Sequence, residues 1–121
     1  MSNNVPTLNE EARIGEDYRL SFKFLNPNGT PAVLSGSSIQ SIFRYQDSSG
    51  DTEAFPLTTV INFTTGEIQL SLPHTTTVNM REAVGEYDVV LIDSLGIKEV
   101  ILHVTLSMQW SVTLSPVPTP V

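Results

Sequence analysis

Apolar and polar residues alternate with a period of two along much of this chain. Between residues 18 and 24, Tyr18, Leu20 and Phe22 alternate with polar neighbours. Successive side chains of a β-strand point to opposite faces, so this alternation predicts a strand with one buried face. The same pattern predicts further strands at residues 39–46, 68–72, 87–92 and 99–113, with weaker candidates at 53–57, 59–63 and 12–14.

Turns that contain glycine separate these strand candidates, at residues 26–29, 47–51, 64–66 and 93–96. The first of them reads Asn-Pro-Asn-Gly, in which proline fixes one φ angle and Asn-Gly favours positive φ, as a chain reversal requires. Short strands at about ten-residue spacing, with no long helical pattern between them, predict an all-β fold. We expect an immunoglobulin-like antiparallel β-sandwich of about 7–9 strands.

Two local departures from plain strands are predicted. Residues 74–80 follow Pro73 and are expected to form one short helical turn that crosses between the sheets, with Val78 and Met80 packed beneath them. The three consecutive threonines at 75–77 are poor helix formers and limit this helix to a turn or two. The last strand exceeds the usual length of about five or six residues, so we expect a bulge or bend near Ser107–Gln109.

The length of 121 residues gives room for one domain with its own core. We expect an N-terminal arm at residues 1–12, a sandwich domain at 13–114 and a proline-rich tail at 115–121. Pro116, Pro118 and Pro120 fix φ at alternate residues and favour an extended, polyproline-like tail. Two interpretations of the ends stay open: they fray, or they lie on a neighbouring subunit as arms.

Charge and composition exclude several classes of partner. The net charge is −7, and the six lysines and arginines are scattered, so we expect neither a nucleic-acid nor a membrane partner. Neither a membrane-spanning apolar run nor a secretory signal is visible in the sequence. The absence of cysteine removes disulfides, thiolate zinc sites and cysteine nucleophiles.

The residues that could carry chemistry form no recognisable catalytic pattern. The histidines are His74 and His103, and no G-x-S-x-G motif accompanies them. Glu86 and Asp88 flank Tyr87, so their carboxylates should point the same way, as a weak calcium site at most. The loop at 47–51 lacks calcium-hand spacing, and phosphate-binding glycine motifs are absent. We therefore expect no catalytic, cofactor or metal site and no enzymatic activity.

Trp110 is the only tryptophan and lies in an alternating stretch that continues to the proline-rich tail. If the sandwich ends near Leu106, Trp110 projects toward a partner as an anchor; otherwise it caps the core. On the first interpretation the candidate partner-binding residues are Trp110, Val112, Leu114, Pro116, Pro118 and Pro120.

Much of the chain resembles a known group of proteins. The matching segments read IGEDYRLSFKF at 14–24, NGTPAVLSG at 28–36, IFRY at 42–45, TTGEIQLSL at 64–72, TTT at 75–77, GEYDVVLID at 85–93 and ILHVTLS at 101–107. They are similar to small immunoglobulin-like β-sandwich structural proteins of tailed bacteriophages, and to the N-terminal domain of phage upper baseplate proteins. The positions that match are Leu34, Gly36, Arg44, Gly66, Ile68, Leu70, Gly85, Tyr87 and Asp88.

The resemblance implies a virion structural protein, made in the host cytoplasm, that contributes assembly contacts to a tail, baseplate or fibre. Its expected partners are other virion proteins and further copies of itself. Two alternatives stay open: a capsid decoration (cement) protein, and a carbohydrate-binding module for host-surface glycans. The carbohydrate alternative would use Trp110 and Tyr18 as sugar-facing aromatic side chains.

Overall fold

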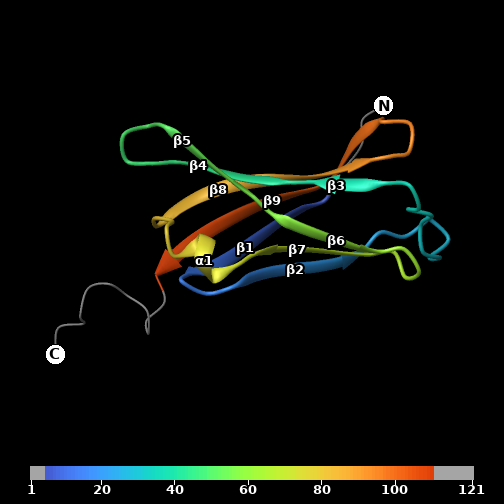
Figure 1. Cartoon of the computed structure of the whole chain (residues 1–121), viewed down its shortest axis with the longest axis horizontal. Coiled ribbons are helices and arrows are strands. Elements are labelled where there is room, and N and C mark those ends of the chain that lie inside the picture. The colour runs from blue at the N-terminus through green and yellow to red at the C-terminus, as the bar shows by residue number, and fades with distance from the viewer. Residues whose placement is uncertain (1–4, 111–121) are drawn as a thin grey trace.

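The computed structural model describes residues 5–110, which form a two-layered β-sandwich (Figure 1). This confirms the predicted all-β class. The elements, in chain order, are β1 (Thr7–Ile14), β2 (Tyr18–Lys23), β3 (Ser38–Gln40), β4 (Ile42–Gln46), β5 (Thr52–Pro56), β6 (Thr58–Asn62), β7 (Glu67–Leu72), α1 (His74–Thr77), β8 (Ala83–Ile92) and β9 (Lys98–Trp110).

The two sheets differ in size. The larger sheet has the strand order β1-β9-β8-β4-β5, and β3 also pairs with β8. The smaller sheet has the order β2-β7-β6. Within residues 5–110 all strand pairings are antiparallel except that of β1 with β9, which is parallel, so the predicted antiparallel sandwich carries one parallel pair at the edge of its larger sheet.

The core lies between the sheets and is built from alternate residues of each strand. On β7, Ile68, Leu70 and Leu72 are completely buried, as the period-two pattern predicted. They face the buried residues of β8 and β9, which include Tyr87, Val89, Val104, Leu106 and Met108. Burial of each large apolar side chain contributes about 1.5–3 kcal/mol, so this shared interior is the main source of stability.

The predicted turn at Asn26–Gly29 forms between β2 and β3. The backbone N–H of Gly29 donates to the carbonyl of Asn26 at 2.9 Å, and Gly29 has φ +88°, a conformation that glycine adopts without strain. Each of the other predicted turns also contains a glycine at positive φ, namely Gly50, Gly66 and Gly96.

The N-terminal boundary of the sandwich differs from the prediction. Residues 7–12, which we assigned to a separate arm, form most of β1 and pair in parallel with β9 from Thr7↔His103 to Ile14↔Trp110. Only Ala12 and Ile14 of this strand are buried, so most of β1 carries no apolar alternation that the sequence could reveal.

The long last strand is irregular at a different place from the one predicted. Val89 pairs with Leu102 and Val90 with Val100, which leaves Ile101 as an extra residue on β9. This bulge lies near the start of the strand, whereas residues 107–109 pair regularly with β1. Because the bulge interrupts the alternation, the adjacent Ile101 and Leu102 are both buried. Val100, which a regular alternation with Leu102 and Val104 would place in the core, is exposed.

The predicted helical turn is confirmed as α1, which links β7 of the small sheet to β8 of the large one. Met80 is buried as expected. Val78, however, is exposed, and Thr77 lies beneath the helix in its place with no accessible surface. The hydroxyl of Thr77, rather than an aliphatic side chain, therefore lies against the turn between β1 and β2.

Candidate functional site

A cluster of charged side chains lies on the outer face of the large sheet. His103 of β9 stands between Glu86 and Asp88 of β8, and Asp88 pairs directly with His103 in the strand register. The Nδ1 atom of His103 is 2.6 Å from Oδ1 of Asp88, and Nε2 is 2.9 Å from Oε1 of Glu86. The two carboxylates point the same way, as predicted, but no pattern in the sequence indicated that His103 lies between them.

The electrostatics of this cluster favour a charged imidazole. Both ring nitrogens face a carboxylate, and both can donate a proton only when His103 is cationic. The hydrogen bond to Asp88, and then that to Glu86, raise the pKa of His103 above its ordinary value. A depression of about 410 Å³ adjoins the cluster and is lined by polar residues that include Gln40, Ser41 and Arg44.

The raised pKa of His103 predicts a pH-dependent contribution to stability. A histidine whose pKa is higher in the folded state stabilises the fold below its unfolded value of about 6.5, and this contribution is lost as pH rises through the folded value. Relative to a His103→Gln variant, the wild-type chain should therefore lose thermal stability over a range that begins at about pH 6.5 and extends upward through the raised folded pKa. Melting curves of both proteins across this range test it, and parallel curves would contradict it.

An NMR titration provides the matched control. The Cε1–H resonance that disappears in the His103→Gln variant belongs to His103, and it should titrate above the ordinary histidine value. Asp88→Asn removes the shorter of the two charged contacts and should lower that pKa. Asp17 does not contribute to this pH dependence. The backbone N–H and ring of His74 lower the pKa of its carboxyl, so its own contribution to stability is lost only as the pH falls into the acidic range.

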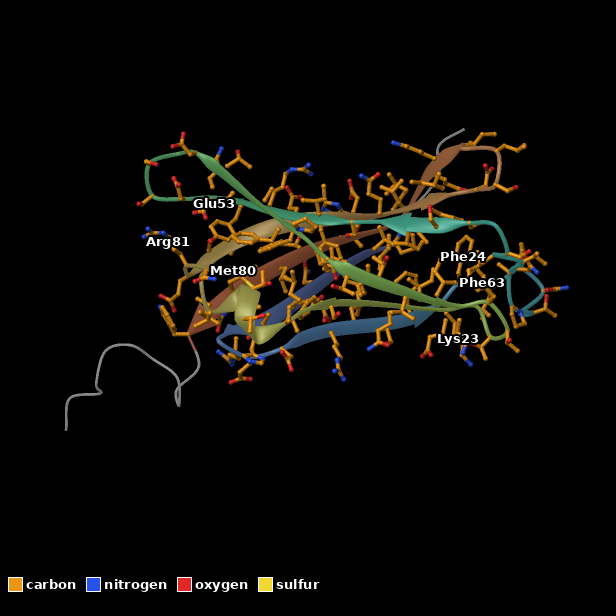
Figure 2. The ribbon with its side chains drawn as sticks, viewed as in Figure 1. Lys23, Phe24, Glu53, Phe63, Met80 and Arg81 are labelled. Carbon is orange, nitrogen blue, oxygen red and sulfur yellow. The ribbon has the colours of Figure 1, made fainter. Side chains whose placement is uncertain are left out.

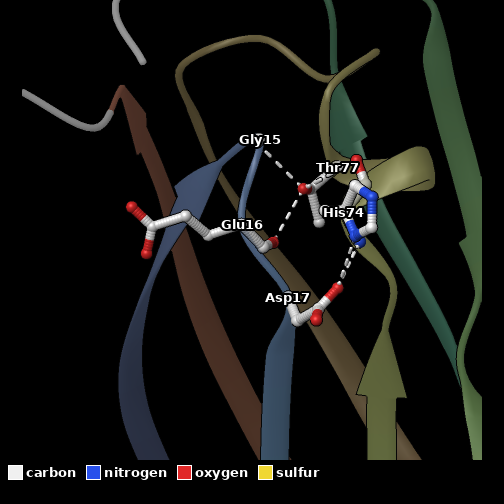
Figure 3. Close-up of polar contacts among 5 residues, drawn as sticks. All are labelled: Gly15, Glu16, Asp17, His74 and Thr77. Carbon is white, nitrogen blue, oxygen red and sulfur yellow. Dashed lines mark hydrogen bonds and ion pairs between the residues drawn. The ribbon is translucent and has the colours of Figure 1, made fainter. Parts of the chain in front are cut away.

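His74, the other histidine, takes part in contacts that hold α1 in place (Figure 3). Its backbone N–H donates to Oδ1 of Asp17 at 2.6 Å, and its Nδ1 lies 3.1 Å from the same oxygen. Beside it, the Gly15 N–H donates to Oγ1 of Thr77 at 3.1 Å, and that hydroxyl donates to the Glu16 carbonyl at 2.8 Å. These contacts fasten α1 to the turn between β1 and β2, and we call them the α1 clamp.

A pair of tyrosines lies inside the sandwich. The hydroxyl oxygens of Tyr18 and Tyr87 are 2.7 Å apart, and both side chains are buried. Burial raises the pKa of Tyr18 to about 12 and also raises that of Tyr87, so both hydroxyls are neutral and hydrogen-bond each other. Tyr18 is therefore unable to contact a sugar at the surface, which corrects its assignment as a sugar-facing residue.

An apolar groove opens at one end of the sandwich, and we call it the end groove. It has a volume of about 520 Å³, and nine of its eleven lining residues are apolar; the exceptions are Lys23 and Glu99. Its lining comes from the start of β1, the end of β2 and the start of β9, so both sheets contribute, and Figure 1 shows these strand ends at the same end of the sandwich. Figure 2 places Phe24 and Lys23 at this end and Met80 and Arg81 at the opposite end.

The candidate partner-binding residues fall mostly outside the described part of the chain. Trp110 is the exception: it ends β9 and is half-buried against the core, and its backbone N–H donates to Oε2 of Glu82 at 3.3 Å. The sandwich does not end near Leu106, so Trp110 fits the capping interpretation. The others lie beyond residue 110, and their role stays a prediction: Val112, Leu114, Pro116, Pro118 and Pro120.

Two negative findings concern residues 5–110. No group of three or more histidine, cysteine or acidic side chains in this range is arranged to hold a metal ion. Among the helices of the same part of the chain, none has the length and apolar character that a membrane crossing requires.

The known proteins compared with this chain do not assign it to a family. No family model matches the sequence, and no curated protein matches it. Among solved structures, a family 123 glycoside hydrolase from Clostridium perfringens, which hydrolyses glycolipid glycans, aligns with 90% of this chain at 15% identity and a TM-score of 0.40. The chain spans about a quarter of that enzyme, 24% of its length. A likeness at this level carries no argument about function.

Proposed function

We propose that this protein is a structural component of a tailed-phage virion, associated with the tail, baseplate or fibre, that acts through contacts between subunits and not through catalysis. It is made in the host cytoplasm and incorporated with other virion proteins and further copies of itself. The sequence resemblance supports this proposal, and the structural observation that carries it is the end groove. Contiguous apolar surface at a groove is typical of a site that another protein covers.

The edges of the sheets supply further contact surface. Within the described residues, β1 and β5 end the larger sheet and β2 and β6 end the smaller one, so each has one unpaired side. Unpaired strand edges bind extended segments of other chains through backbone hydrogen bonds. A small sandwich with open edges and an apolar groove is suited to assembly by surface contact.

Sedimentation of lysates from the cells that produce the chain tests the proposal. As a virion component, the chain should sediment with phage particles and not at its own mass of 13.3 kDa. Immunogold labelling then locates it: label on tails supports the proposal, and label on capsids supports the decoration-protein alternative. A chain that stays at low mass while mature particles sediment would contradict both.

A further inference from the structure

We propose that the end groove binds the proline-rich segment 115–121 of a second copy of this chain. The inference rests on the proposed function, since it names one of the subunit contacts that assembly would use. Three features support it: the surface of the groove, the chemistry of the segment, and the distance between them within one chain.

The groove has the surface that an uncharged extended segment needs. Three of the apolar side chains that line it, those of Leu8, Leu25 and Val100, are exposed, and Val100 has 39% of its surface accessible. Phe22 and Phe24 form part of the wall and are half-buried. Covering such surface gains about 25 cal/mol for each square ångström removed from water.

The segment matches this surface. Residues 111–121 contain no charged side chain in a protein of net charge −7, so they meet no repulsion there. Pro116, Pro118 and Pro120 favour the polyproline II conformation, which docks on aromatic-lined grooves in other recognition domains. Its backbone is already restricted, so ordering it on binding costs less conformational entropy than ordering an ordinary tail.

The dimensions of the chain indicate that the segment comes from another copy. Leu102 is the groove residue nearest to Trp110 along β9 and precedes it by eight positions, about 26 Å at 3.3 Å per strand residue. The six steps from Trp110 to Pro116 span at most about 22 Å. Pro116 therefore falls short of the groove of its own chain, and only the residues from Pro118 onward have enough chain to reach its near edge. The complete segment with its three prolines fits only into the groove of another copy. Figure 1 shows β9 running from the groove end to the opposite end of the sandwich.

A donor segment and an acceptor groove at opposite ends make the contact heterologous. Each copy can then give its segment to one neighbour and receive one from another, which produces a ring if the rotation closes and a row if it does not. The geometry thus points to head-to-tail assembly of copies.

Disulfide trapping tests the contact directly, because the wild-type chain has no cysteine. One full-length variant carries Val117→Cys in the segment and another carries Val100→Cys in the groove. Mixed under mild oxidation, they should form a crosslinked heterodimer. The control replaces Val100→Cys with Val60→Cys on β6, whose side chain is more exposed, at 56% against 39%. Equal yields from both mixtures would indicate random collision and overturn the inference.

Complementation provides a second test on full chains. A groove variant, Val100→Lys with Leu25→Lys, and a segment variant, with Pro116, Pro118 and Pro120 replaced by serine, should each self-associate about tenfold or more weakly in sedimentation. An unchanged circular dichroism spectrum confirms folding. Mixing the two variants should restore one contact per pair, because each supplies the part that the other lacks.

The results separate this inference from the proposed function. If both variants associate like the wild type, or if mixing restores nothing, the inference is overturned, yet the chain can still sediment with phage particles through its strand edges. If crosslinking and complementation succeed while the chain stays out of the particles, the head-to-tail contact stands and the virion role fails.

Discussion

Replacing Gly85 with alanine should destabilise the fold by about 3 kcal/mol or more, a large part of the stability of a small domain. A Cβ atom at this position would lie 2.3 Å from the carbonyl oxygen of Arg44 and 2.6 Å from the ring of Phe43. One obstacle is backbone and the other is a completely buried ring, so neither can move without separating β4 from β8. Urea unfolding of Gly85→Ala against the wild type measures the loss.

The neighbouring residue provides the control. Val84 lies on the same strand with its side chain directed outward and 66% exposed, so Val84→Ala should change the free energy of unfolding by less than about 0.5 kcal/mol. The comparison separates close strand approach from the general effect of mutating β8. A Gly85→Ala protein as stable as Val84→Ala would show that β4 and β8 lie further apart than described.

The strands that the sequence revealed are those with one fully buried face. β7 and the central part of β8 alternate cleanly because each passes through the middle of the sandwich. β1 gave almost no signal because it lies at the edge of its sheet, where only Ala12 and Ile14 reach the core. Its parallel pairing with β9 joins residues that lie 96 positions apart in the chain, and no local sequence pattern indicates which strand β1 pairs with.

The sequence predicted that β9 contains a bulge and that a helical turn follows β7, but it did not predict which residue bulges or which residue of the turn points inward. A strand as long as β9 needed a bulge, but the extra residue is Ile101, where burial of two adjacent apolar residues hides the break in alternation. The helical turn was placed correctly, yet apolarity favoured Val78 as its inward residue. The geometry of a single turn instead directs Thr77 inward, where its hydroxyl finds backbone partners.

The candidate sites depend on contacts between distant segments, and this limited their prediction. Glu86 and Asp88 were recognised as neighbours on one face, but their link to His103 follows from the β8–β9 register, which the bulge shifts by one residue. The end groove brings together residues near positions 5–8, 22–25 and 99–102. Each group taken alone has the composition of an ordinary strand end, so the sequence contained no local signal for the groove.

The α1 clamp carries the second large effect that we expect. Thr77→Val keeps the size and shape of the side chain but removes the hydroxyl that accepts from the Gly15 N–H and donates to the Glu16 carbonyl. Thr77 has no accessible surface, Gly15 is half-buried, and both hydrogen bonds are part-buried, so the two backbone groups lose a partner that water replaces only incompletely. A typical hydrogen bond contributes about 0.5–1.5 kcal/mol and an unsatisfied buried group costs more, so losing both bonds at this part-buried site predicts a loss of about 2–3 kcal/mol.

Thr77→Ser reverses the comparison, because it keeps the hydroxyl and removes one methyl group. It should cost only about 1 kcal/mol, the value of a buried methylene with a small cavity. The order of stability, measured by thermal or urea unfolding, should therefore be wild type, then Thr77→Ser, then Thr77→Val. If packing rather than hydrogen bonding held α1 to the β1–β2 turn, the two variants would exchange places, since valine preserves the packing and serine the hydrogen bonds.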